Sequence, residues 1–113
     1  MWLQDNGNGM NSIELKDIDE YFGNKNFMPL LPLLEKPYSE VRHIDDAKLL
    51  AIVEYALEWE TKDYWQSLSI GWIEDGLPIK QSTLQMMEAI PNDKGYTQKL
   101  RHRVIKLLKQ KES

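Results

Sequence analysis

The chain has 113 residues, which suffices for one hydrophobic core but not two, so we expect a single domain over residues 1–113. It contains no cysteine, which excludes disulfide scaffolds, zinc–thiolate sites and thiol catalysis and is compatible with a reducing compartment. No apolar run approaches the roughly 18 residues of a membrane span, and the N-terminus lacks a signal pattern. We therefore expect a cytoplasmic protein that does not bind membranes.

The charge is uneven along the chain. Residues 1–97 carry 17 acidic and 8 basic side chains, a net of −9, whereas residues 98–113 carry 1 acidic and 6 basic side chains, a net of +5. An acidic body disfavours nucleic-acid binding over most of the surface and favours basic partners. The alternative interpretation is that the charge serves solubility alone.

The N-terminal part contains turn and helix signals. Residues 1–12 hold two Asn-Gly steps, which favour the tight turn of a β-hairpin, although the flanking strands would be short. We expect either a short hairpin or a mobile arm in this segment. Asp17 and Glu20 then have capping-box spacing, which predicts a short helix through Phe22 that ends at Gly23.

Residues 27–34, FMPLLPLL, form an apolar run that is interrupted by Pro29 and Pro32. Proline fits neither a helix interior nor a central strand. We therefore expect either a short helix that begins at Pro29 or an apolar segment that covers the core. The PxxP spacing leaves polyproline recognition as an alternative.

Residues 45–76 carry three of the four tryptophans and two of the five tyrosines, so the core is expected to form around them. From residue 48 to residue 59, apolar side chains recur at helical spacing over most of the circumference, which is typical of a central, buried helix. Asp45 and Asp46 precede it as caps. Ala51, Glu54 and Glu58 mark the expected solvent stripe.

The second half of this stretch, residues 63–75, has an apolar face of its own. This face is rotated from the first, which predicts a break near residues 60–63, with Thr61 or Asp63 capping a second helix. A glycine within the face predicts a close helix crossing, and Gly76 followed by Pro78 is a stop signal. The expected inward residues are Tyr64, Trp65, Leu68, Gly71 and Trp72.

The C-terminal part predicts two more helices. Residues 79–90 are amphipathic and end at Pro91, and Thr97 is placed to cap a final helix. Residues 109–113 are expected to fray. The final helix would bury Leu100, Val104, Leu107 and Leu108 and carry Lys99, His102, Arg103, Lys106 and Lys109 on its other side. The pattern as a whole predicts an all-α, single-domain bundle of four to six helices around a central pair rich in Trp and Tyr.

The search for reaction chemistry gives no motif. The chain has two histidines, His43 and His102, and no zinc-protease, P-loop, nucleophile-elbow or dinucleotide pattern. The acids next to His43 are explained by helix capping. We therefore expect a protein that is not an enzyme and has no catalytic residue, metal site or cofactor.

Protein binding is the remaining positive interpretation. Aromatic side chains among carboxylates can anchor and steer a basic protein partner. The candidate partner-binding residues are Glu54, Tyr55, Glu58, Glu60, Asp63, Tyr64, Glu74 and Asp75.

The segments EYALEWETKDYW and WIEDG, in a small, acidic and cysteine-free helical chain, resemble the immunity proteins of bacterial toxin systems such as contact-dependent inhibition. The resemblance covers residues 45–96. It lies in size, charge and the mixture of aromatic and acidic residues, without a diagnostic motif. It implies a protein that binds the catalytic domain of a toxin, often a basic nuclease, and blocks it. The basic tail departs from the pattern.

That basic tail carries the alternative function. Lysine and arginine can neutralise phosphates, so the final helix would suit a small nucleic-acid-associated or adaptor module.

A last hypothesis concerns Glu60 and Arg101, which both fall on apolar arcs of their helices. A carboxylate that faces a core needs a partner, and the guanidinium fork of arginine can satisfy both oxygens. We therefore expect either a buried Glu60–Arg101 pair or a break in the helix that leaves Glu60 in solvent.

Overall fold

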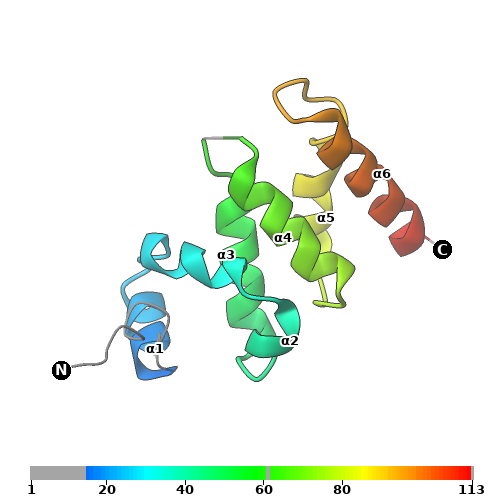
Figure 1. Ribbon diagram of the computed structural model, residues 1–113. Helices are drawn as coiled ribbons and strands as arrows, with labels where there is room; N and C mark the ends of the chain where they lie inside the picture. The colour runs from blue at the N-terminus through cyan, green and yellow to red at the C-terminus, as the bar shows by residue number, and fades with distance from the viewer. Residues whose placement is uncertain (1–14, 61, 113) are drawn as a thin grey trace.

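The computed structural model describes residues 15–60 and 62–112, and in this part of the chain it contains helices and no strand. The prediction of an all-α protein is confirmed. Figure 1 shows α1 at one end and α6 at the other end of a molecule that measures 49 × 25 × 24 Å. The hairpin or arm expected in residues 1–12 lies outside the described residues. The helices are α1 (Leu15–Gly23), η2 (Met28–Glu35), α2 (Tyr38–Val41), α3 (Asp46–Leu57), α4 (Tyr64–Glu74), α5 (Gln81–Glu88) and α6 (Gln98–Glu112).

Two short elements precede the central helices. The proline-containing run forms η2, a 3-10 helix that buries four leucines, so it is a helix and a cover for the core rather than an exposed polyproline ligand. The single turn α2 was not expected. It follows Pro37 and buries Val41.

α3 lies at the centre of the fold, as predicted, in contact with η2, α4 and α5. The carboxylate of Asp45 accepts a hydrogen bond of 2.7 Å from the backbone N–H of Ala47, which caps the start of the helix. α3 ends at Leu57 and α4 begins at Tyr64, so the predicted break is confirmed. The buried side chains of α3 are Leu49, Leu50, Ile52, Val53, Ala56 and Leu57.

The expected inward face of α4 is wrong in its orientation. Of the five residues assigned to it, Trp72 alone is buried, and Tyr64 is 55% exposed. The helix is turned so that Ile70 and Ile73 join Trp72 in the core, where the indole N–H of Trp72 donates to the carbonyl of Lys36. Tyr64 and Trp65 stay nearer the surface, where their polar atoms can find partners. The observed buried set is Gln66, Ser69, Ile70, Trp72 and Ile73.

The predicted stop after α4 is confirmed. Gly76 has a φ of +115°, its N–H donates to Ile73, and the N–H of Leu77 donates to Trp72, which is the Schellman arrangement. The close helix crossing expected at Gly71 is wrong. A Cβ at this position would meet one neighbour, the guanidinium of Arg103, at an ordinary contact distance of 3.7 Å.

The last two helices agree with the sequence. Thr97 caps α6 by accepting a hydrogen bond of 3.2 Å from the N–H of Leu100, and Leu100, Val104 and Leu107 are buried. Asp63 does not cap α4 with its side chain. Its carboxylate instead accepts from the N–H and the hydroxyl of Thr97, at 3.1 and 2.8 Å, which ties the start of α4 to the start of α6. α6 extends to Glu112, and the fraying expected for residues 109–113 stays a prediction.

Every helix contributes to one cluster of buried apolar residues, from Ile18 in α1 to Leu107 in α6. None of the helices in residues 15–60 and 62–112 is both long enough and apolar enough to cross a membrane.

Candidate partner-binding site

The eight candidate residues fall into three groups in the structure. Tyr55, Glu58 and Glu60 lie together at the C-terminal end of α3 and line one pocket. Tyr64 begins α4 and bonds to Glu35, whereas Glu74 ends α4 and pairs with Arg103, and Asp75 follows as an exposed residue. The remaining two, Glu54 and Asp63, have carboxylates that are used within the fold.

Glu54 does not belong to a free solvent stripe. Its side chain is half-buried, and its Oε2 accepts hydrogen bonds from the hydroxyls of Ser82 and Thr83 at 2.7 and 2.6 Å. Thr83 is fully buried. Glu54 therefore fastens the start of α5 to α3, and its expected role in steering a partner is replaced by a structural one.

The pocket at the end of α3 has aromatic and acidic walls. Tyr55, Glu58, Trp59 and Glu60 line a cavity of about 380 Å³. The ring centroids of Tyr55 and Trp59 are 5.6 Å apart, and the ring planes are inclined by 49°. Glu58 and Glu60 are exposed, and neither forms an ion pair or a hydrogen bond within the described chain. We call these four residues the end pocket.

The two rings of the end pocket are supported from behind. The ring of Phe27 lies 5.6 Å from that of Tyr55, and Phe22 meets Phe27 edge-on at 5.0 Å. The fully buried Gln66 donates from Nε2 to the carbonyl of Trp59 at 2.9 Å, so α4 holds the chain where it leaves α3. These contacts hold the backbone of Trp59 and pack the ring of Tyr55 before any partner arrives.

Sequence reasoning missed two residues of this region. Trp59 was assigned to the core, although its position between Glu58 and Glu60 was a signal for an acidic and aromatic site. Gln66 was not singled out, because a glutamine in an amphipathic helix is normally expected at the surface. The sequence gives no sign that its amide bonds to the carbonyl of Trp59.

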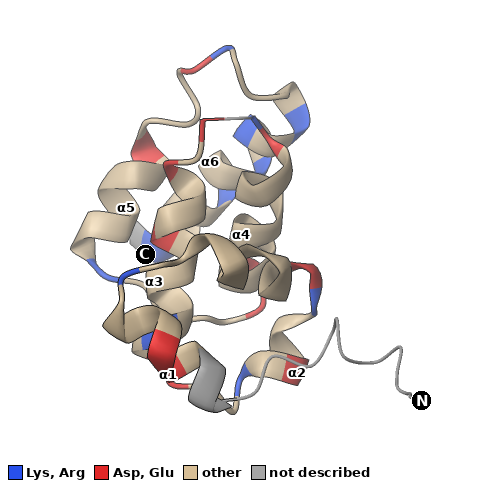
Figure 2. Ribbon diagram, turned by 90° about the vertical axis from the view of Figure 1, so that its left-hand side faces the viewer, with Lys and Arg blue, Asp and Glu red and all other residues tan. Residues whose placement is uncertain are grey.

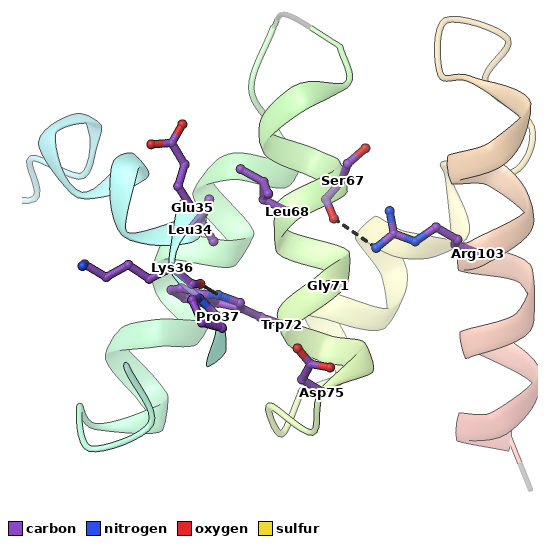
Figure 3. Close-up of a pocket in the computed structure, with 10 residues that line it drawn as sticks. All are labelled: Leu34, Glu35, Lys36, Pro37, Ser67, Leu68, Gly71, Trp72, Asp75 and Arg103. Carbon is purple, nitrogen blue, oxygen red and sulfur yellow. Dashed lines mark hydrogen bonds between the residues drawn. The ribbon is translucent and has the colours of Figure 1, made fainter. Parts of the chain in front are cut away.

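A second hollow, of about 400 Å³, lies between the end of η2, α4 and α6 (Figure 3). The indole N–H of Trp72 donates to the carbonyl of Lys36 at 2.8 Å on one side. On the other side, Arg103 reaches from α6 to the carbonyl of Ser67 at 3.2 Å and forms an ion pair with Glu74 at 2.7 Å. The charge of Glu74 is therefore compensated within the fold.

The remaining rim of this hollow is also mixed in charge. Glu35 and Asp75 stand beside Lys36 and Arg103. The hydroxyl of Tyr64 donates to Glu35, and this hydrogen bond raises the pKa of Tyr64 above its ordinary value. Because both signs of charge are present, this hollow does not select for a basic partner.

The hypothesis of a buried pair between Glu60 and Arg101 is wrong. Glu60 is exposed, as the alternative stated, and forms no ion pair with Arg101. The break after Leu57 turns Glu60 away from the apolar arc of α3. Arg101 is half-buried, and its charge adds to the larger effects of the Gly95 N–H and Lys62 that lower the pKa of Asp93.

The basic side of α6 is present in part, because Arg103, which was expected on it, is half-buried and turns to α4, where it pairs with Glu74. Lys99, His102 and Lys106 are exposed on its outer side, and basic positions recur along the helix in Figure 2. His43 is exposed between α2 and α3. Within the described residues, no group of three or more histidine, aspartate or glutamate side chains is placed to hold a metal ion.

Comparisons of the chain with protein-family models, with curated proteins and with solved structures found no match. The case for a function therefore depends on the geometry and charge of the sites described above.

Proposed function

We propose that this protein binds a basic protein partner and inhibits it, in the manner of an immunity protein that neutralises a bacterial toxin domain in the cytoplasm. The observation that carries the proposal is the end pocket, in which the carboxylates of Glu58 and Glu60 have no counterion among residues 15–60 and 62–112 and stand beside two aromatic rings. Carboxylates speed the approach of a basic protein, and aromatic anchors contribute most to affinity once it has arrived. The absence of cysteine fits a reducing compartment.

The test begins with affinity capture of the partner from cells of the source organism, followed by stopped-flow measurement of association. The variant Glu58→Lys/Glu60→Lys should slow association by about tenfold or more, because steering by charge changes association rates by roughly 10- to 1,000-fold. The rate for the unmodified protein should fall as salt is raised.

The matched control is Glu40→Lys/Glu88→Lys, which changes the net charge equally at two exposed sites without a partner in the described chain. Equal slowing by the two double variants would assign the effect to net charge and contradict the role of the end pocket. Inhibition is tested by co-expression. The captured partner should be toxic to a host alone and harmless when this protein is present.

The outer side of α6 supports a second candidate, a nucleic-acid-associated or adaptor module. Lys99 and Lys106 are exposed on α6 and can reach a phosphate backbone. We expect no appreciable binding of duplex DNA or RNA at physiological salt in a fluorescence anisotropy titration. A micromolar or tighter affinity that falls steeply with salt would favour this second function.

A further inference from the structure

We infer that the end pocket receives a single arginine side chain of the partner. This inference rests on the proposed function, and it specifies the chemical group that the protein recognises. Three features of the pocket support it: its aromatic and acidic lining, its unpaired carboxylates and the contacts that position its residues. The chemistry of the guanidinium group then favours arginine over lysine.

The walls combine the two kinds of group that bind an organic cation. The faces of Tyr55 and Trp59 attract a cation through the ring quadrupole. Glu58 and Glu60 add two carboxylates that can accept charge-assisted hydrogen bonds. A cavity of about 380 Å³ lies at the small end of the range for ligand sites, which suits one side chain rather than a peptide segment.

Glu58 and Glu60 bring two negative charges to the pocket, and neither has an ion-pair partner in the part of the chain that the structure describes. The pocket lies at the C-terminal end of α3, where the helix dipole and its free carbonyl groups favour a positive charge. Lys62 is the next basic residue along the chain, and it is already engaged. Its Nζ lies 3.0 Å from Asp93 and 5.0 Å from the ring centroid of Tyr96. The positive charge that this site lacks would come from the partner.

The ring of Tyr55 and the backbone of Trp59 have contacts that position them in the free protein. Phe27 supports Tyr55, and Gln66 holds the carbonyl of Trp59 from the buried side of α4. A cation therefore meets a preformed surface and does not have to order it, which lowers the cost of binding.

Arginine fits this surface better than lysine. Its guanidinium is planar and stacks on aromatic faces, it is more weakly hydrated than an ammonium group, and its five N–H donors can serve two carboxylates at once. The ammonium of lysine is a strongly hydrated point charge without a face to stack.

The experiment uses the full chain and three short blocked peptides, Ac-Gly-X-Gly-NH₂, in which X is arginine, lysine or citrulline. Citrulline keeps the planar shape of arginine and lacks its charge. The readout is the indole N–H resonance of Trp59 in a two-dimensional NMR titration, assigned with the variant Trp59→Phe. We expect the arginine peptide to shift this resonance saturably with a dissociation constant in the millimolar range. Lysine should bind at least about threefold more weakly, and citrulline should show no saturation.

The variant Glu58→Gln/Glu60→Gln should weaken arginine binding by about tenfold or more, whereas Glu40→Gln/Glu88→Gln should leave it within about twofold. All four positions are exposed, so both variants should keep the unfolding midpoint of the parent. An unmoved Trp59 resonance up to tens of millimolar arginine peptide, or equal shifts from arginine and citrulline, would overturn the inference.

The test separates this inference from the proposed function. If a basic protein associates in a salt-dependent way and the arginine peptide leaves Trp59 unchanged, the arginine site is refuted while partner binding stands. If the arginine peptide saturates the pocket and no basic protein is captured, the site stands and the inhibitor function is refuted.

Discussion

The hydrogen bonds between Glu54 of α3 and the start of α5 predict that Glu54 contributes strongly to the free energy of unfolding. One carboxylate oxygen of Glu54 accepts hydrogen bonds from Ser82 at 2.7 Å and from Thr83 at 2.6 Å. Substitution Glu54→Ala removes both bonds and leaves the fully buried hydroxyl of Thr83 without its acceptor. We expect this single change to be among the most destabilising outside the apolar core.

The magnitude follows from the number of bonds and their exposure. Hydrogen bonds to a charged group contribute about 1.5–3 kcal/mol each, and the half-buried position of Glu54 places these at the lower end. The loss should therefore be about 2–4 kcal/mol in the free energy of unfolding. With a urea m-value of about 1–3 kcal/mol/M, the unfolding midpoint should fall by roughly 0.7–4 M.

The assay is urea unfolding followed by tryptophan fluorescence, with Glu58→Ala as the control. Glu58 lies four residues further along, carries the same charge and is exposed without a partner in the described chain, so its loss should change stability by less than about 0.5 kcal/mol. Thr83→Val tests the contact itself. In a double-mutant cycle, Glu54→Ala and Thr83→Val should be coupled by about 1–2 kcal/mol. Equal effects of Glu54→Ala and Glu58→Ala, or additive effects in the cycle, would refute the fastening.

Two further predictions concern the backbone and pH. Gly76→Ala should lower the stability by about 1–2 kcal/mol in thermal unfolding, because a residue with a Cβ is strained at a φ of +115°. No atom lies within 4 Å of the added Cβ, so the cost comes from backbone strain alone. An unchanged melting temperature would contradict this. The pKa of Asp93 is lowered from 3.8 by the N–H of Gly95 and by Lys62, so its carboxylate stabilises the fold above pH 3.8 and this contribution is lost as pH falls through the lower folded-state pKa. The stability difference between the parent and Asp93→Asn should therefore be constant from pH 5 to 7 and shrink below about pH 4, and a difference that grows with acid would refute it.

The features that the sequence predicted correctly are local in origin. Asp45 caps α3, Gly76 ends α4 and Thr97 caps α6, and in each case the decisive hydrogen bond or dihedral angle involves residues a few positions apart. The break between α3 and α4 was also visible, because two apolar faces of one continuous helix cannot point in different directions. Such signals can be read from a single chain.

The features that the sequence missed depend on distant neighbours. The rotation of α4 depends on its packing against α3, η2 and α6, which the sequence of α4 alone does not show. From the sequence, the side with the larger aromatic residues was predicted to face the core in place of Ile70 and Ile73. Glu54 reads as a solvent residue because its partners lie 28 and 29 positions away. Gln66 reads as polar surface because its amide reaches back across the break to Trp59.

The same distinction applies to the candidate site. The sequence grouped Tyr55, Glu58 and Glu60 correctly, since they fall within six residues at the end of one helix. It also included Glu54 and Asp63, whose carboxylates are engaged by hydroxyl groups of α5 and of the residue before α6. Charge alone could not separate exposed carboxylates without a partner in the described chain from carboxylates that hold the fold together.

The most direct measurement of the central claim is oxidative footprinting of Trp59 and Trp65 in the complex with the captured partner. Both indoles are half-buried in the free protein, but Trp59 lines the end pocket and Trp65 packs edge-on against Tyr64 on the outer side of α4. Binding at the end pocket predicts strong protection of Trp59 and little change at Trp65. Protection of Trp65 with Trp59 still oxidised at its free rate would place the partner elsewhere and contradict the account.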